Sequence, residues 1–317
     1  MIATLLGLEG SKALLTGTLF CGILTFALLA GCRRFLPRDG GREFAHEGAL
    51  SAGKPRGAGL LIVLAFLLSA LCFLPFSVET LIYLLLTGAA MLTGFLDDAA
   101  KHPWGELKKG LLDLVLAALA AFTYVNFQGS EFLFLGNRVA LPPVVFGILA
   151  AALIWGSINV TNCSDGVDGL CGTLSVISLL TIYSIGLATG IGGEFTPASV
   201  IFIGAILAYL WFNATPSRLL MGDAGSRAIG FFLAVAILKT GRPVLYLPAA
   251  LVLLVDGGSS LFKVSVIRFL KIKIMTNIRT PLHDHVRKNK EWSNTQVVFR
   301  FAILQALVSF VTVCLVK

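Results

Sequence analysis

The stretch AALIWGSINVTNCSDGVDGLCGTLSVISLL, residues 151–180, sets a short polar segment between two apolar runs. Each run continues past the quoted letters to roughly 20 residues, the length that crosses the hydrocarbon core of a bilayer. Over its 317 residues the chain is 56% hydrophobic and only 13% charged, whereas soluble domains have about 25% charged residues. The composition excludes an ordinary soluble protein and predicts an all-α polytopic membrane protein.

Apolar runs of this kind recur along the whole chain and predict ten transmembrane helices. They are expected near residues 13–31, 58–76, 80–96, 110–127, 139–158, 169–190, 195–212, 222–238, 243–267 and 297–316. The fourth run contains Asp113, and the eighth and ninth have short uninterrupted apolar cores. No small-residue cleavage site follows the first run, so we expect it to remain as the first helix.

The basic residues are divided unevenly between the two sets of loops that alternate along these spans. One set, at residues 32–57, 97–109, 159–168, 213–227 and 268–300, holds 19 of the 25 lysines and arginines, and the other set holds 5. Because positively charged loops stay in the cytoplasm, the first set is expected to be cytoplasmic. An even number of spans then places both chain termini outside.

Carboxylates are costly at membrane depth unless they serve a function, and here they gather at the expected cytoplasmic ends of the spans. They are Asp97, Asp98, Asp165, Asp168, Asp223 and Asp284. Asp97 and Asp98 end the third span about 100° apart on a helix, so they can serve two partners, such as a metal and a phosphate. Lys101 follows one turn later, and Lys108 and Lys109 open the next helix. The alternative is a solvated helix end with ordinary i,i+4 pairs.

Two further acidic segments lie on the same side. Asp165 and Asp168 are three residues apart, so one helical turn would put both carboxylates on one face, and Gly166 and Gly169 allow close backbone approach. A simple turn rich in Asn, Asp and Gly is the alternative. Asp223 opens the eighth span, where it could also cap the helix. Capping and metal binding do not exclude each other.

The last long loop carries His283 and His285 on either side of Asp284, among several lysines and arginines. No partnering set of Cys or His has the spacing of a zinc site, so the histidines favour a phosphate-bearing ligand. Carboxylates for a hard cation together with basic groups for phosphates are typical of Mg²⁺-dependent phosphoryl transfer. A G-x-x-x-x-G-K-[ST] loop is absent from the sequence, which argues against an ATP-driven pump.

Four motifs, in this order, carry a resemblance to a known family. They are FLDDAAK (95–101), NCSDGVDGL (162–170), LLMGDAGS (219–226) and TPLHDH (280–285). From about Lys54 to Arg300 the chain resembles the polyprenyl-phosphate N-acetylhexosamine-1-phosphate transferases, and among them the phospho-N-acetylmuramoyl-pentapeptide transferases. The resemblance implies a single ten-helix catalytic domain, residues 1–317, in the bacterial inner membrane. It would move phospho-MurNAc-pentapeptide from UDP to undecaprenyl phosphate, with Mg²⁺ and on the cytoplasmic face, giving lipid I and UMP.

The resemblance also implies roles for single residues. Asp97 would deprotonate the lipid phosphate, with Asp98 as its catalytic neighbour. Asp223 would bind magnesium, although a two-step scheme makes it the covalent nucleophile instead. Lys109 falls where the family has a lysine near the phosphates, and Lys101 would guide the lipid phosphate. The nucleotide pocket would be built by Lys54, Asn162, Asp165, Gly166, Val167, Asp168, Asn213 and Leu220.

The sequence departs from the family pattern at three places. His283 and His285 match the outer members of a three-histidine motif, the first expected to be catalytic and the second to bind substrate, but Asp284 replaces the middle histidine. Leu220 stands where the family usually has phenylalanine, which would weaken stacking on uracil. Arg56 lies in a first-loop motif that differs from the usual Pro-Thr-Met-Gly-Gly, and one hypothesis is that it restores the lost positive charge.

Two other functions stay open from the sequence. A sibling enzyme would use UDP-GlcNAc in the same reaction, although residues 280–283 resemble the muramoyl form. A secondary transporter also carries intramembrane acids, but its acids would lie near mid-span and the two halves of its chain would be related. The expected partners are the two substrates and the lipid bilayer, with no nucleic acid. A homodimer is left open, because glycine-containing spans permit close helix packing.

Overall fold

The fold comes from a computed structural model that describes residues 10–41, 51–75, 77–191, 193 and 195–316. Residues 42–50, in the first loop expected to be cytoplasmic, and both chain ends lie outside the described residues. The long helices are α2 (Gly10–Cys32), α3 (Gly59–Phe73), α4 (Val78–Asp98), α5 (Glu106–Gln128), α6 (Pro143–Cys163), α7 (Leu170–Thr189), α8 (Phe195–Asn213), α9 (Gly222–Lys239), α11 (Leu251–Ser265) and α13 (Asn294–Val316). The short elements are η1 (Arg33–Phe35), β1 (Glu131–Phe134), β2 (Asn137–Ala140), η3 (Pro243–Leu245), α10 (Tyr246–Ala249), η4 (Val266–Leu270) and α12 (Leu282–Lys290).

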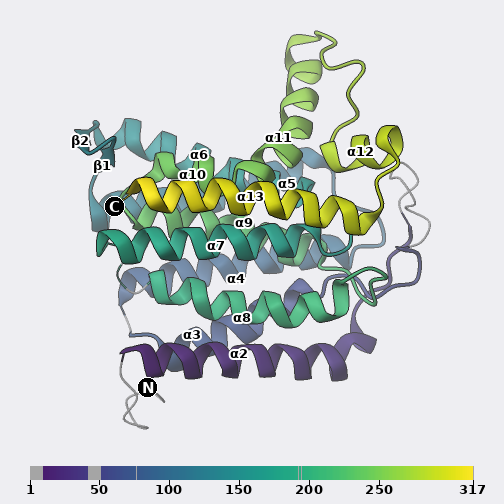
Figure 1. Cartoon of the computed structure of the whole chain (residues 1–317), viewed down its shortest axis with the longest axis horizontal. Helices are drawn as coiled ribbons and strands as arrows, with labels where there is room; N and C mark the ends of the chain where they lie inside the picture. Colours follow the sequence, from purple (N-terminus) through teal and green to yellow (C-terminus); the bar gives the residue numbers. More distant parts are fainter. Residues whose placement is uncertain (1–9, 42–50, 76, 192, 194, 317) are drawn as a thin grey trace.

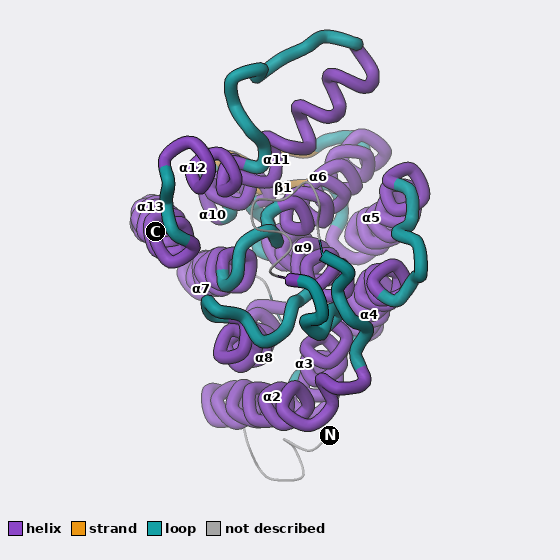
Figure 2. Tube along the Cα trace, turned by 90° about the vertical axis from the view of Figure 1, so that its right-hand side faces the viewer, coloured by secondary structure: helices purple, strands orange, loops and turns teal. Residues whose placement is uncertain are grey.

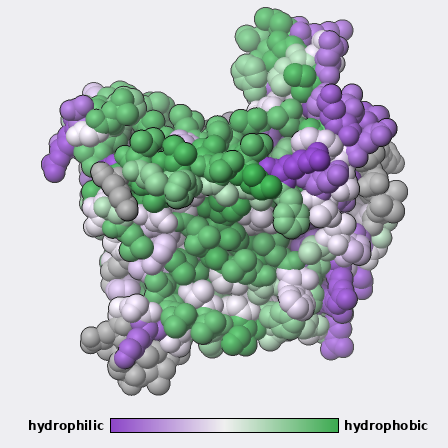
Figure 3. Space-filling model, in the orientation of Figure 1, coloured by the Kyte–Doolittle hydropathy of each residue, from purple (hydrophilic) through white to green (hydrophobic). Residues whose placement is uncertain are grey.

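The long helices lie side by side in one bundle, from which α11 projects (Figure 1). Seven helices of the described chain are long and apolar enough to cross a membrane: α2, α4, α5, α6, α7, α8 and α13. Their outward faces carry many large apolar side chains (Figure 3), as a bilayer requires. The prediction of an all-α, multi-pass membrane protein is confirmed.

The other three expected spans also contain helices, but these differ from simple crossings. Helix α3 has only 15 residues, and α9 carries the charged residues Asp223, Arg227 and Lys239. The ninth expected span is bent by 91° between Pro243–Ala249 and Leu251–Leu270, so it is not one straight helix. Helix α2 begins and α13 ends at the same end of the bundle (Figure 1), away from α12.

The bend in the ninth span is stabilised by one glutamine of α13. The side-chain amide of Gln305 donates to the carbonyl oxygens of Pro248 and Ala249, at 3.0 and 3.1 Å. Its Oε1 accepts the N–H of Val252 at 2.9 Å. Proline cannot donate to a helix, and freed backbone groups at membrane depth need partners inside the protein. Gln305 supplies them, and α11 then leaves the bundle (Figure 1), with Phe262 and Val264 of its far half exposed.

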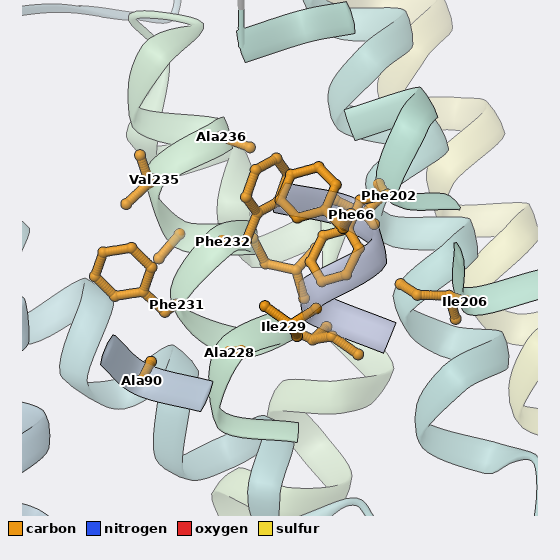
Figure 4. Close-up of a cluster of buried hydrophobic side chains, with 14 of the residues drawn as sticks. Phe66, Ala90, Phe202, Ile206, Ala228, Ile229, Phe231, Phe232, Val235 and Ala236 are labelled. Carbon is orange, nitrogen blue, oxygen red and sulfur yellow. The ribbon is translucent and has the colours of Figure 1, made fainter. Parts of the chain in front are cut away.

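Helix α9 is the centre of the bundle. It packs against α3, α4, α6, α7 and α8, and every residue from Gly222 to Leu238 is buried; Figure 2 shows it surrounded by the other helices. Phe66, Phe202 and Phe232, from α3, α8 and α9, form a tight aromatic group (Figure 4), with the Phe66 and Phe202 rings stacked at 4.2 Å. This packing fixes the position of α9, whose first residues form the candidate site.

Candidate active site

The candidate site lies where α4 ends and α9 begins. The carboxylate of Asp98 accepts the backbone N–H groups of Asp223 and Ala224, at 3.1 and 3.0 Å. Asp98 therefore caps α9 from another helix, satisfying donors that a helix start leaves free. Gly222 has a φ of +73°, and a side chain there would overlap the Asp98 carboxylate. This glycine is what allows α4 and α9 to meet so closely.

Asp97, the neighbour of Asp98, points to different partners. Its carboxylate accepts the backbone N–H of Trp104 at 2.6 Å and pairs with the Lys109 ammonium at 2.5 Å. Lys109 Nζ also lies 3.0 Å from Asp223 Oδ2. One ammonium thus bridges two carboxylates from α4 and α9. Asp97 and Asp98 thus point to different protein partners, Lys109 and Arg56, while their expected roles toward a metal and a phosphate stay predictions.

Arg56 supplies a second cation to the same cluster. Its Nε lies 2.8 Å from Asp98 Oδ1, one terminal nitrogen lies 3.3 Å from Asp223 Oδ1, and the other lies 3.4 Å from Asp39 Oδ1. Burial alone would lower the pKa of Arg56, but these carboxylates outweigh it and hold that pKa above its ordinary value. Asp39, like Arg56, was absent from the predicted site residues. Arg56 belongs to the site through direct charge contacts.

The chemistry of this cluster fits a divalent cation that is shared with phosphate. Four carboxylates, those of Asp39, Asp97, Asp98 and Asp223, surround the two cations Lys109 and Arg56. Among the described residues no three His, Cys, Asp or Glu side chains form a ready-made metal site. Mg²⁺ needs only one or two protein carboxylates when substrate phosphates and waters complete its shell. Asp223 and Asp97, which share the Lys109 ammonium, carry the carboxylate oxygens that fit such a magnesium site.

A second group of predicted residues joins three loops beside this cluster. Lys54 Nζ donates to Ser217 Oγ at 2.9 Å and lies 3.9 Å from Asp168 Oδ2. Asp168 in turn accepts the backbone N–H of Ser217 at 3.0 Å. Lys54 and Asp168 are each only partly buried, so both remain available to a ligand. Ser217, which the sequence analysis passed over, connects them.

Two asparagines hold the walls of this region in place. Asn213 accepts the N–H of Gly169 at 2.7 Å and donates to the carbonyl oxygen of Leu219 at 2.9 Å. Both ends of its amide are therefore occupied by backbone, and it positions loops. Asn162 donates to Ser226 Oγ at 2.9 Å, linking the end of α6 to α9.

The remaining predicted pocket residues surround these loops. Leu220 exchanges backbone hydrogen bonds with the first loop, donating to Pro55 O at 2.8 Å and accepting from Ala58 N at 3.1 Å. Val167 is buried, and the charge of Asp165 acts on Arg56. A side chain on Gly166 would overlap the ring of His283. Gly166 thus lies against the last loop, and Leu220 lies against the first loop.

His283 is fixed by an acid that the sequence analysis missed. Its backbone N–H donates to Asp256 Oδ1 at 2.8 Å, and its ring Nδ1 lies 2.8 Å from Asp256 Oδ2. Both side chains are almost fully buried. Asp256 lies within the ninth apolar run, where a carboxylate is itself a sign of function. This isolated carboxylate could be seen in the sequence, but its partner His283 lies 27 residues away and meets it only in the fold.

Other predicted residues lie farther from this centre. Asp284 is 3.4 Å from Arg287 and 4.0 Å from His283 Nε2, and His285 Nδ1 accepts the N–H of Arg279 at 3.3 Å. Lys101 is exposed, and within the described residues its side chain has no hydrogen-bond or ion-pair partner. Lys108 instead lies over the ring of Trp104, with 3.4 Å between Nζ and the ring centroid. The site therefore has a compact centre and an exposed basic approach.

Comparison with known proteins gives one consistent result. Residues 80–241 match glycosyl transferase family 4. The phospho-N-acetylmuramoyl-pentapeptide-transferase of Treponema pallidum (strain Nichols) is 42% identical, over 94% of this chain and 88% of its own length. Proteins of the same name from Wolbachia pipientis wMel and Symbiobacterium thermophilum are 28% and 29% identical, covering 96% and 94% of this chain and 98% and 92% of their own.

Proposed function

Because the chain belongs to glycosyl transferase family 4 and, within it, to the phospho-N-acetylmuramoyl-pentapeptide-transferases, we propose that it transfers phospho-MurNAc-pentapeptide from UDP to undecaprenyl phosphate. A phosphate oxygen of the lipid would attack the sugar-linked phosphorus of the UDP substrate. The bond from that phosphorus to the bridging oxygen would break, and UMP would leave with the electron pair. The products are lipid I and UMP.

The bridging of Asp97 and Asp223 by Lys109 is the observation that carries this proposal. Phosphoryl transfer is catalysed mainly by positioning and by neutralising charge on the phosphate oxygens. Lys109 and Arg56 bring two positive charges to one end of α9, and Asp97 lies beside them as a proton acceptor for the lipid phosphate. Asp98 holds the start of α9, and so the backbone of Asp223, in position.

Magnesium would be held by Asp223. Asp97 lies close by, because the same Lys109 ammonium contacts both carboxylates. When bound, Mg²⁺ would neutralise charge on the substrate phosphates and the departing UMP. The one-step reaction needs no covalent bond to Asp223. The carboxylate oxygens of Asp223 are already engaged by Lys109 and Arg56. This arrangement suits a residue that holds a cation better than one that attacks phosphorus.

The nucleotide would bind along the loops that carry Lys54 and Asp168. Their half-buried charges offer a donor and an acceptor to the nucleotide, and Gly166 leaves room for the His283 ring. Leu220 offers an apolar side chain for the base without an aromatic ring. His283, aligned by Asp256, and His285 would contact the diphosphate. The substrate-binding role of Lys101 is then electrostatic guidance of the lipid phosphate from an exposed position.

We place the site on the cytoplasmic face of the bacterial inner membrane, with both chain termini outside. The support is the sequence's charge bias, together with the position of the start of α2 and the end of α13 at one end of the bundle (Figure 1). Residues 1–317 would act as a single catalytic domain. A homodimer is consistent with the exposed apolar faces of α2 and α13.

The sugar is tested by offering the purified protein both UDP-MurNAc-pentapeptide and UDP-GlcNAc with undecaprenyl phosphate. We expect UMP release from the first and little from the second. A preference for UDP-GlcNAc would instead assign the sibling reaction. Asp284 and Leu220, which differ from the family pattern, would then be the residues to connect with that change of sugar. UMP release in detergent, where no compartments exist, also distinguishes the enzyme from a transporter.

A further inference from the structure

A cavity of about 830 Å³ lies between the β-hairpin, the bend of the ninth span and the last turns of α13. Its walls are largely apolar and include Leu133, Leu135, Val244, Pro248, Leu307 and Val311. This volume is within the range of natural ligand sites. The cavity is at the end of the bundle where α13 finishes, opposite α12 and the candidate active site (Figure 1), so it is separate from the reaction described above.

The cavity exists because of how the hairpin and the bend are held. Leu133 N donates to Gly241 O at 2.8 Å, which fixes β1 above the start of η3. The turn of 91° after Ala249 then directs α11 away, so that no residue of α11 lines the cavity. The hairpin tip is apolar: Leu135 lies in its tight turn, with a φ of +46°, and is 85% exposed. An exposed apolar tip beside an apolar cavity is typical of a surface that faces lipid.

Two arginines that have no ion-pair partner among the described residues stand at this cavity. Arg242 lines it, and its Nε is buried without a hydrogen-bond partner. Arg138 pairs directly with Leu133 across the hairpin, so both side chains project from the same face. Neither arginine side chain forms an ion pair with any described residue. Glu79, an acid at this end, is already paired with Lys239 at 2.8 Å, and Glu131 on β1 pairs with neither arginine.

We propose that this cavity binds an anionic phospholipid from the adjacent leaflet. An acyl chain would occupy the apolar cavity, and the lipid phosphate would accept hydrogen bonds from Arg242 and Arg138. A buried donor such as Arg242 Nε needs an acceptor, and cations beside an apolar hollow complement an amphipathic anion. A purely apolar occupant would offer neither arginine an acceptor.

The test uses the full-length protein in nanodiscs that contain phosphatidylglycerol or phosphatidylcholine with a photoactivatable group on one acyl chain. Mass spectrometry of the cross-linked peptides locates the lipid. We expect adducts in residues 244–248 and 307–316, with phosphatidylglycerol labelling about tenfold above phosphatidylcholine. The double variant Arg138→Ala/Arg242→Ala should reduce the first to the level of the second. Lys271→Ala/Lys273→Ala, on exposed residues beyond η4, is the matched control and should change nothing.

Equal labelling by both lipids, or full labelling of the double variant, would overturn the proposal. A Leu315→Cys variant identifies the main rival occupant, because rapid disulfide formation between copies would show that a second chain fills the groove. Unchanged UMP release by the arginine variants verifies that they are folded. Loss of lipid selectivity with normal UMP release would therefore support the lipid site, whatever sugar the enzyme transfers.

Discussion

The ring of His283 rests on the carboxylate of Asp256, with 2.8 Å between Nδ1 and Oδ2 and a further bond of 2.8 Å from the His283 backbone N–H to Oδ1. The two contacts fix both the place and the orientation of the ring. An acceptor at Nδ1 favours the neutral tautomer that carries its proton on that nitrogen. The other nitrogen, Nε2, faces Gly166.

Asp256→Asn should therefore reduce the rate of UMP release by about 100-fold, the usual range for a lost acid–base or charge-holding group. If Asp256 acts only through His283, the double variant Asp256→Asn/His283→Asn should be no slower than the His283→Asn single variant. Ser259→Ala, one turn further along α11, is the control and should retain normal activity. Independent, additive losses would show that Asp256 acts by another route.

Gly166→Ala should strongly reduce activity with little effect on expression. The added methyl group would overlap the His283 ring, and a displacement of about 1 Å can cost about 100-fold in rate. Gly156→Ala in α6 is a matched control, because nothing lies within 4 Å of a side chain at that position. Near-normal turnover of Gly166→Ala would mean that His283 has no close role.

Arg56→Ala should weaken binding of the UDP substrate by about tenfold, the effect of one lost charge-assisted hydrogen bond. It should also lower the apparent Tm, since Asp98 and Asp223 lose a cation. Arg56→Lys should recover part of both effects, because the charge returns without the second contact. An unchanged KM for the UDP substrate in Arg56→Ala would reject the idea that Arg56 compensates for the missing histidine.

A buried ion pair between Asp113 and Arg227 joins α5 to α9, through Arg227 Nε at 3.1 Å and a closer contact from a terminal nitrogen. Both side chains are about 2% exposed. Asp113→Asn leaves the guanidinium buried without its counter-charge, which typically costs about 3–5 kcal/mol. We expect a fall in apparent Tm, largely recovered in Asp113→Leu/Arg227→Met. Equal Tm values for wild type and Asp113→Asn would contradict this account.

Chelation of divalent cations should abolish UMP release, and added Mg²⁺ should restore it. Asp223→Asn should raise the Mg²⁺ concentration needed for half-maximal activity, because one ligand charge is lost. Magnesium should also raise the apparent Tm of the wild type but not of Asp223→Asn. This second readout is independent of turnover, and an equal rise in both proteins would place the metal elsewhere.

The apolar runs were sufficient to predict the helical membrane fold, since hydropathy over roughly 20 residues is a local property. The bend after Ala249 was not predicted, because its stability depends on Gln305, which lies more than 50 residues away. Pro248 was the one local sign. The hairpin at 131–140 was also missed, as four-residue strands carry a weak pattern.

The acidic centre could be predicted because carboxylates at span ends stand out from an apolar background. What the sequence could not supply was the partner of each charge. Asp98 was expected beside the chemistry, and it caps α9; Asn213 was expected in the pocket, and it braces two loops. Asp256 was passed over because it lies alone in an apolar run. Lys101 was selected with its neighbours, but it projects into solvent.

The central claim is that Asp97 and Asp223, bridged by Lys109, carry the transfer of the phospho-sugar. Its most direct test is the rate of UMP release by purified wild type, Asp97→Asn and Asp223→Asn, with UDP-MurNAc-pentapeptide and undecaprenyl phosphate at saturating Mg²⁺. We predict rapid release by the wild type and at least about 100-fold slower release by each variant. Near-normal release by either folded variant would contradict the assignment.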